Sequence, residues 1–267
     1  MNKAAESDVW MGMKPNLRLS FHLVALGFVA ILVIGCSGSQ PSTAARSSPA
    51  PTLSAPPTLA LVHGKLIDGT GAAPVADATV LIATDKIVAV GPAASTPVPS
   101  GVQTVDLHGA AILPGFINAH VHEAFDKVNL KAWAEGGVTT VRDESATPET
   151  VQGLKALKAE IATDAHLARM VSMGSMLKSP GDFELGIPMV EIEEMSASGM
   201  TPMQVIEAST RNGAHELRLD SQVGTVATGK VADILVVAGG PLADLQALRN
   251  VSLVVHNGTI IRDNLSR

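Results

Sequence analysis

The chain has 267 residues, of which 46% are hydrophobic and 3% aromatic, and its formal net charge at pH 7 is −6. This length allows one large domain or two small ones, and the apolar fraction is sufficient for a hydrophobic core. The acidic balance argues against a nucleic-acid-binding surface, which requires a basic face, so we expect no nucleic-acid partner. A single cysteine excludes a disulfide framework within one chain.

The N-terminal segment predicts an export signal. Lys14 and Arg18 accompany an almost unbroken apolar run over residues 19–35, which has the size of the hydrophobic region of a signal peptide. The run ends in small residues before Cys36, and this arrangement resembles the lipidation motif of bacterial lipoproteins. We therefore expect residues 1–36 to be a lipoprotein signal peptide, with a lipid on Cys36. This lipid would anchor the chain to a membrane of the cell envelope, on its periplasmic or extracellular side. An uncleaved membrane anchor is the alternative.

Two β-rich segments lie at opposite ends of the remaining chain. They follow a linker over residues 37–58 that is rich in Ser, Pro and Ala, and that we expect to be disordered and flexible. Short strands are predicted in residues 59–113, with a hairpin around Thr84-Asp85-Lys86. Others are predicted in residues 213–267, where Asn257-Gly258 indicates a tight hairpin. Two sequence-distant segments of this kind predict one composite β-sandwich built from both ends.

Between them, residues 114–212 alternate predicted strands and helices. Glycines 136 and 137 are expected to close the first helix, and Thr147-Pro148 has the composition of a helix start. Helices are predicted over Ala124–Glu135, after Thr147 and over Thr201–Thr210. The fold class is therefore α/β.

A pair of histidines marks the first strand of this segment. The sequence from Pro114 to Glu123 reads Pro-Gly-Phe-Ile-Asn-Ala-His-Val-His-Glu. Residues i and i+2 of a strand point to the same face, so the imidazoles of His120 and His122 are expected to converge at the end of the strand. Neutral imidazole is a common ligand of zinc and similar metals. The alternative is a pair of polar side chains on a half-exposed strand.

In this context the histidine motif resembles the first barrel strand of the amidohydrolase superfamily, a superfamily of metal-dependent hydrolases. Further similarities lie in the C-terminal segment at residues 224–226, 229–233 and 240–244, and they bring the chain closest to the imidazolonepropionase-like and prolidase-like branch. The resemblance implies a divalent metal, zinc first among them, held in part by His120 and His122. It also implies hydrolysis of a C–N bond in a small-molecule amide, cyclic amide or dipeptide substrate.

The resemblance implies a TIM-like (β/α) barrel beside the composite sandwich, with Val138–Asp143 and Arg169–Leu177 as its second and third strands. Residues 114–212, the barrel segment, are too short for the complete family fold, so the barrel is incomplete. A (β/α)₈ barrel typically has about 250 residues, more than twice the length of residues 114–212. The similarity passes from the third strand, which ends near Pro180, directly to the approach to the last helix. The later strands would carry the family's remaining ligands, namely a carboxylated lysine, two histidines and an aspartate. Lys178, Asp182 and Glu184 lie near this gap without the family's sequence context, so the catalytic residues stay unknown and the metal is expected to bind weakly.

Three interpretations stay open. The chain is a metal-dependent hydrolase of C–N bonds, or a non-catalytic remnant or binding module that lost turnover through an internal deletion, or an incompletely read full-length enzyme. A partial barrel also exposes a sheet edge, which invites pairing with another chain, so a homo-oligomer is possible.

Overall fold

The computed structural model describes residues 55–145, 148–172 and 187–265. These described residues belong to one compact unit. Several sequence-based predictions lie outside the described residues, namely the signal peptide with Cys36, most of the linker, Thr147, and the group Lys178, Asp182 and Glu184. Among the described helices, none is both long and apolar enough to cross a membrane.

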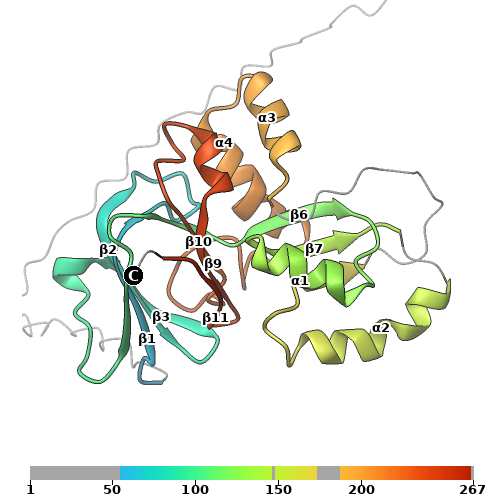
Figure 1. Ribbon diagram of the computed structural model, residues 1–267, viewed down its shortest axis with the longest axis horizontal. Helices are drawn as coiled ribbons and strands as arrows, with labels where there is room; N and C mark the ends of the chain where they lie inside the picture. The colour runs from blue at the N-terminus through green and yellow to red at the C-terminus, as the bar shows by residue number, and fades with distance from the viewer. Residues whose placement is uncertain (1–54, 146–147, 173–186, 266–267) are drawn as a thin grey trace, which may run out of the picture. The chain divides into compact units, whose positions relative to one another are not determined.

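Strands from the two ends of the described chain form one eight-stranded sheet (Figure 1). Its order is β11-β10-β9-β5-β1-β2-β3, and β4 pairs with β1. The antiparallel pairing of β5 with β9 joins the N-terminal and C-terminal segments. Strands from both ends thus come together as predicted, and the eight described strands form one hydrogen-bonded sheet. The strands are β1 (Leu59–Leu66), β2 (Val75–Ala83), β3 (Lys86–Pro92), β4 (Gln103–Asp106), β5 (Ala111–Pro114), β9 (Ile234–Val237), β10 (Val251–His256) and β11 (Thr259–Asp263).

Strand β9 is buried on both of its faces. Successive side chains of a strand point in opposite directions, so Ile234 and Val236 pack in the core enclosed by the eight-stranded sheet. Leu235 and Val237 pack in a second core, which includes the helices and strands of the barrel segment. All four side chains are fully buried. The run Ile-Leu-Val-Val thus serves two cores, and this explains why it has no polar residue.

Two predicted hairpins are present at the turns of the sheet. Strands β2 and β3 pair antiparallel around Thr84 and Asp85. Strands β10 and β11 pair across Asn257 and Gly258, whose φ angles are 47° and 76°. Asn-Gly favours such a turn because both central residues require positive φ. The predicted hairpins are confirmed.

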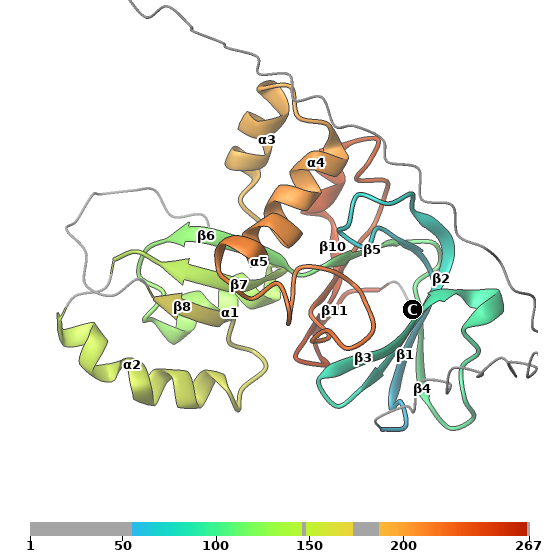
Figure 2. The same ribbon diagram turned by 180° about the vertical axis from the view of Figure 1, so that it is seen from behind.

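The barrel segment is a second, parallel sheet of three described strands in the order β6-β7-β8. These are β6 (Phe116–Val121), β7 (Val138–Asp143) and β8 (Arg169–Ser172), connected through α1 (Lys127–Glu135) and α2 (Pro148–Ile161). Figure 2 shows the three strands side by side from behind. The described residues thus contain three parallel strands and two connecting helices without closure, which agrees with an incomplete barrel.

Helix α1 begins later than its sequence suggests. The predicted start at Ala124 is wrong, because Asp126 is the N-cap and its carboxylate accepts a hydrogen bond from the Val128 N–H at 2.8 Å. Its end is as predicted, with Gly136 as the C-cap and Gly137 at a φ of 98°. The inward face of α1 buries Trp133 against the barrel segment.

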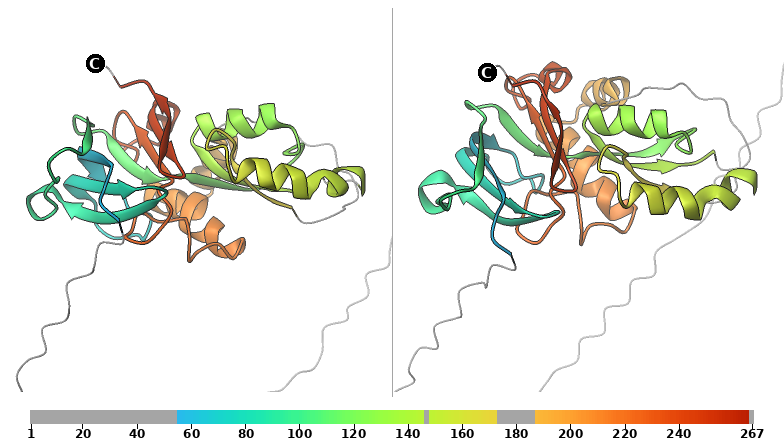
Figure 3. Two further views of the ribbon diagram at one scale, coloured as in Figure 1. Left: turned by 90° about the horizontal axis from the view of Figure 1, so that it is seen from below. Right: turned by 60° about the horizontal axis from the view of Figure 1, so that its bottom comes forward.

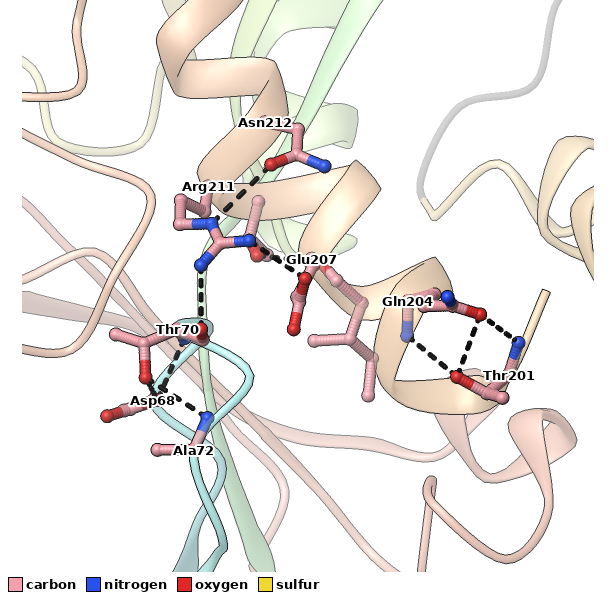
Figure 4. Close-up of polar contacts among 10 residues, drawn as sticks. Asp68, Thr70, Ala72, Thr201, Gln204, Glu207, Arg211 and Asn212 are labelled. Atoms are coloured by element: carbon pink, nitrogen blue, oxygen red, sulfur yellow. Dashed lines mark hydrogen bonds and ion pairs between the residues drawn. The ribbon is translucent and has the colours of Figure 1, made fainter. Parts of the chain in front are cut away.

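The last helical segment contacts the N-terminal sheet through polar groups. It contains α3 (Met189–Ala197), α4 (Pro202–Glu207), a π-helical turn (Ala208–Asn212) and α5 (Gly213–Glu216). Thr201 and Gln204 form a capping box at the start of α4, as Figure 4 shows. Arg211 pairs with Glu207 at 2.8 Å and donates to the Thr70 carbonyl oxygen at 2.6 Å. Figure 3 shows the helices of this segment, in orange, and α1, in green, from two further directions. Two 3₁₀ helices, Ala93–Ser95 and Leu245–Arg249, complete the described elements.

A buried ionic network fastens the barrel segment to the eight-stranded sheet. Arg169 of β8 donates to Asp233 at 2.8 Å, to Asn257 at 2.8 Å and to Thr140 at 3.0 Å. The Asp233 carboxylate also accepts from the Asn257 N–H at 2.9 Å and lies 3.8 Å from Nε2 of His256. Since the partners come from β7, β8 and the strands at the C-terminus, the network fixes how the two sheets meet.

Candidate functional site

The histidine pair lies at the C-terminal end of β6. His120 is the second-last residue of the strand and His122 is the first residue after it. Their ring centroids are 5.3 Å apart with an interplanar angle of 65°. The His120 side chain is 68% exposed, so solvent and small solutes can reach it. The structure thus brings the two rings together as the spacing indicates, while their role as metal ligands stays a prediction.

Two neighbouring residues that the sequence reasoning missed fix the surroundings of His120. Nδ1 of His120 lies 3.4 Å from Oε2 of Glu144, and Arg142 pairs with the other oxygen of Glu144 at 2.9 Å. Arg142 also donates to the Ala119 carbonyl oxygen at 2.7 Å, which holds the backbone beside His120. A sequence signal did exist, because both residues are at the end of the next parallel strand, and such strand ends meet at one edge of a sheet.

The loop after the histidines is clamped by the end of β7. The fully buried carboxylate of Asp143 accepts from the Ala124 N–H at 2.7 Å and from the Ser145 N–H at 2.8 Å. The Ser145 hydroxyl in turn accepts from the Glu123 N–H at 2.8 Å. Glu123 has a φ of 59°, a left-handed conformation that costs a residue other than glycine about 1–2 kcal/mol. These hydrogen bonds hold the strained residue next to His122, so the position of the imidazoles does not depend on a free loop.

The residues around the histidines supply only part of a metal site. In the described part of the chain, no three or more His, Cys, Asp or Glu side chains form a group that could hold a metal ion. A catalytic zinc normally has three protein ligands and water. Glu144 is near His120, but its carboxylate pairs with Arg142 at 2.9 Å. The fit is therefore incomplete, with two imidazoles in place and no third ligand among the described residues.

Comparison with known proteins agrees with this architecture. The model of the amidohydrolase family matches residues 154–261. Adenine deaminase 4 from Rhizobium meliloti is 32% identical over 49% of this chain and 17% of its own length. Imidazolonepropionase from Brevibacillus brevis is 29% identical over 53% of this chain and 33% of its own length. The matched region thus spans a third or less of the length of these curated relatives.

Solved structures show the same fold at low sequence identity. A putative prolidase from Bifidobacterium longum has a TM-score of 0.67 at 16% identity, over 79% of this chain and 97% of that chain. Molinate hydrolase has a TM-score of 0.66 at 16% identity, over 77% of this chain and 94% of that chain. The chain is thus similar to the amidohydrolase family over residues 154–261, and its fold is similar to those of the two solved structures.

Proposed function

We propose that this chain acts in metal-dependent hydrolysis of C–N bonds, on a small-molecule amide, cyclic amide or dipeptide. The observation that carries the proposal is the pairing of His120 and His122 at the end of β6, with ring centroids 5.3 Å apart. The names of the relatives, which include an adenine deaminase, an imidazolonepropionase and prolidases, support this class of reaction.

The residues in place have defined tasks in this proposal. His120 and His122 hold a divalent metal, zinc first among them, and Arg142 and Glu144 keep His120 oriented. When bound, such a metal polarises a carbonyl oxygen and lowers the pKa of a bound water. The remaining ligands and the general acid–base group come from residues outside the described ranges or from a second chain. No side chain among the described residues is assigned a catalytic role.

A second candidate is a non-catalytic remnant or binding module. The ligand count among the described residues favours it, because two imidazoles hold a divalent metal only weakly. In this alternative the sheet and the partial barrel persist, while turnover is lost.

Metal content and turnover, measured together, test the proposal. The purified chain is loaded with zinc and dialysed, and its metal content is then measured. Hydrolysis of a panel of dipeptides and cyclic amides is followed with the same protein. Loss of one residue that hydrogen-bonds a metal ligand typically lowers metal affinity by about 10–100-fold. With only two ligands, the affinity for zinc should lie below that of a complete site by more than this factor. His120→Ala combined with His122→Ala should abolish the binding that remains and leave the fold intact. His63→Ala with His108→Ala is the matched control, because both side chains are exposed and both lie away from β6, His63 on β1 and His108 in the turn after β4.

The result distinguishes the two candidates. Stoichiometric metal with turnover that only the double variant at 120 and 122 loses establishes the hydrolase. Weak metal binding with background turnover establishes the non-catalytic module. Metal binding that the double variant retains would contradict both.

We also propose that the chain is a lipoprotein of the cell envelope. The basic residues, the apolar run and the small residues before Cys36 support this. Cys36→Ala should leave the precursor unprocessed and without lipid, as measured by mass spectrometry of the membrane fraction. Wild-type protein that is freely soluble and carries no lipid mass would refute it.

A homo-oligomer remains part of the proposal, because β8 pairs only with β7 among the described strands and leaves a sheet edge open.

A further inference from the structure

A cleft of about 900 Å³ lies between the start of α1 and the facing side of α2. One wall comes from the loop between β6 and α1 and from the first turn of α1, and the opposite wall comes from α2. Ligand sites in proteins commonly have volumes of about 300–1,000 Å³, so the cleft can hold a small molecule. Its described lining residues are Glu123, Phe125, Asp126, Lys127, Val128, Ser145, Gly153, Ala156, Leu157 and Glu160.

The hollow arises from the residues that α2 places on one face. Gly153, Ala156, Leu157 and Glu160 have the spacing i, i+3, i+4 and i+7, which aligns side chains along one side of a helix. The first two are small, and a Cβ atom built on Gly153 would meet nothing within 4 Å. Consequently α1 and α2 leave apolar surface uncovered between them.

The opposite wall offers apolar contact that the protein itself does not cover. Val128 is 71% exposed, one of two large hydrophobic residues with such exposure in the described chain. The ring of Phe125 is half-buried and reaches the barrel core with its inner side. A ligand between the helices would remove both side chains from water, and burial of apolar surface is favourable.

The charges at the edge of the cleft are predominantly negative. Glu123, Asp126 and Glu160 provide three carboxylates, and Lys127 provides one ammonium group. Lys127 pairs with Glu160 at 2.7 Å, and Asp126 accepts a hydrogen bond as the N-cap of α1. Glu123 is exposed, and its backbone is fixed by Ser145. Because carboxylates outnumber the single ammonium group, a cation matches the charge of this edge.

We propose that the cleft binds a small amphipathic amine, with an apolar body between α1 and α2 and an ammonium group at Glu123. The apolar body contacts Phe125, Val128 and Leu157, and the small residues of α2 provide the room for it. This site goes beyond the proposed hydrolysis, because it uses neither His120 nor His122.

Isothermal titration calorimetry with 2-phenylethylamine and 3-phenylpropionate tests the proposal on the full chain purified in detergent, in the presence of a chelator. The two probes share a phenylethyl body and differ in the sign of their charge. The amine should bind with a Kd of about 1 mM or lower and roughly tenfold or more tightly than the carboxylate. Glu123→Gln should remove most of this preference.

Matched tryptophan variants locate the site. Ala156→Trp fills the cleft and should abolish binding of the amine. Ala159→Trp is the control on the same helix, because Ala159 is exposed and does not line the cleft. If Ala156→Trp does not fold, Gly153→Leu is the second blocking variant, since leucine is a better helix former than glycine.

Three results would overturn the proposal. They are equal binding of the amine and the carboxylate, binding that Ala156→Trp and Gly153→Leu both retain, and no heat of binding with either probe at millimolar concentration. Retained amine binding in the variant that lacks His120 and His122 is expected, and it separates this site from the proposed metal site.

Discussion

Asp233→Ala is expected to lower the free energy of unfolding by about 3–5 kcal/mol, the cost of breaking a buried ion pair by removal of one partner. The Asp233 side chain is 3% exposed and accepts from Arg169 at 2.8 Å and from the Asn257 N–H at 2.9 Å. Truncation leaves the guanidinium of Arg169 without its anionic partner and this N–H without its acceptor at the junction of the two sheets. Urea denaturation at pH 7, followed by circular dichroism, measures the change.

An exposed ion pair provides the control for this variant. Glu193 pairs with Arg249 at 3.0 Å, and both side chains are about half-exposed. Glu193→Ala should therefore leave the urea midpoint nearly unchanged, since exposed pairs are screened by water. Equal midpoints for Asp233→Ala and Glu193→Ala would show that the buried network does not hold the sheets together.

The same carboxylate predicts a pH dependence of stability. Burial alone would raise the pKa of Asp233, but the charges of His256 and Arg169 and the hydrogen bonds from Asn257 and Arg169 outweigh it and hold this pKa below its ordinary value. The folded-state pKa therefore lies below the unfolded value of about 3.9. The contribution of Asp233 is complete above the unfolded pKa and is lost as the pH falls through the folded pKa. Below a pH of about 4, wild-type stability should fall more steeply than that of Asp233→Asn.

Gly258→Ala is expected to destabilise the protein by about 2–5 kcal/mol, the sum of a left-handed backbone cost and of overpacking. Gly258 has a φ of 76°, and a Cβ atom there would overlap the carbonyl oxygen of Thr84 and lie 3.0 Å from the Cα of Asp85. Both contacts are with backbone atoms of the turn between β2 and β3. That turn cannot rotate away as a side chain could, so the two hairpins would have to separate.

Gly229→Ala isolates the backbone part of this effect. Gly229 has a φ of 88°, and a Cβ atom there would meet nothing within 4 Å. It should therefore cost only the left-handed conformation, about 1–2 kcal/mol. The difference between the two urea midpoints measures the contact between the hairpins, and equal midpoints would mean that the contact is absent in solution.

Local patterns were sufficient to predict many elements of this fold. Asn257-Gly258 indicated a hairpin because few residues accept positive φ at two successive positions, and Gly136-Gly137 indicated the end of α1 for a similar reason. The start of α1 was mislocated, because Ala124 continues the apolar pattern while the hydrogen bond at Asp126 determines where the helix begins. In each correct case, the decisive forces act within a few residues along the chain.

The composition of the site was only partly predictable. The i, i+2 spacing of His120 and His122 was enough to expect two imidazoles together, because strand geometry is local. Glu144 was missed, because its distance of 3.4 Å from His120 results from the pairing of β6 with β7. The cleft between α1 and α2 was also missed, since small residues on a helix leave a hollow only when the neighbouring helix lies opposite.

The sequence by itself determined the two β-rich ends, the parallel strands with their connecting helices and the histidine pair, since each rests on a short motif or a repeating pattern. Only the tertiary structure decided that β9 is buried on both faces and that Arg169 meets Asp233 and Asn257, residues separated from it by 64 and 88 positions. Such contacts depend on how two sheets pack, and packing is set by the shape and burial of the whole core rather than by neighbours in the chain.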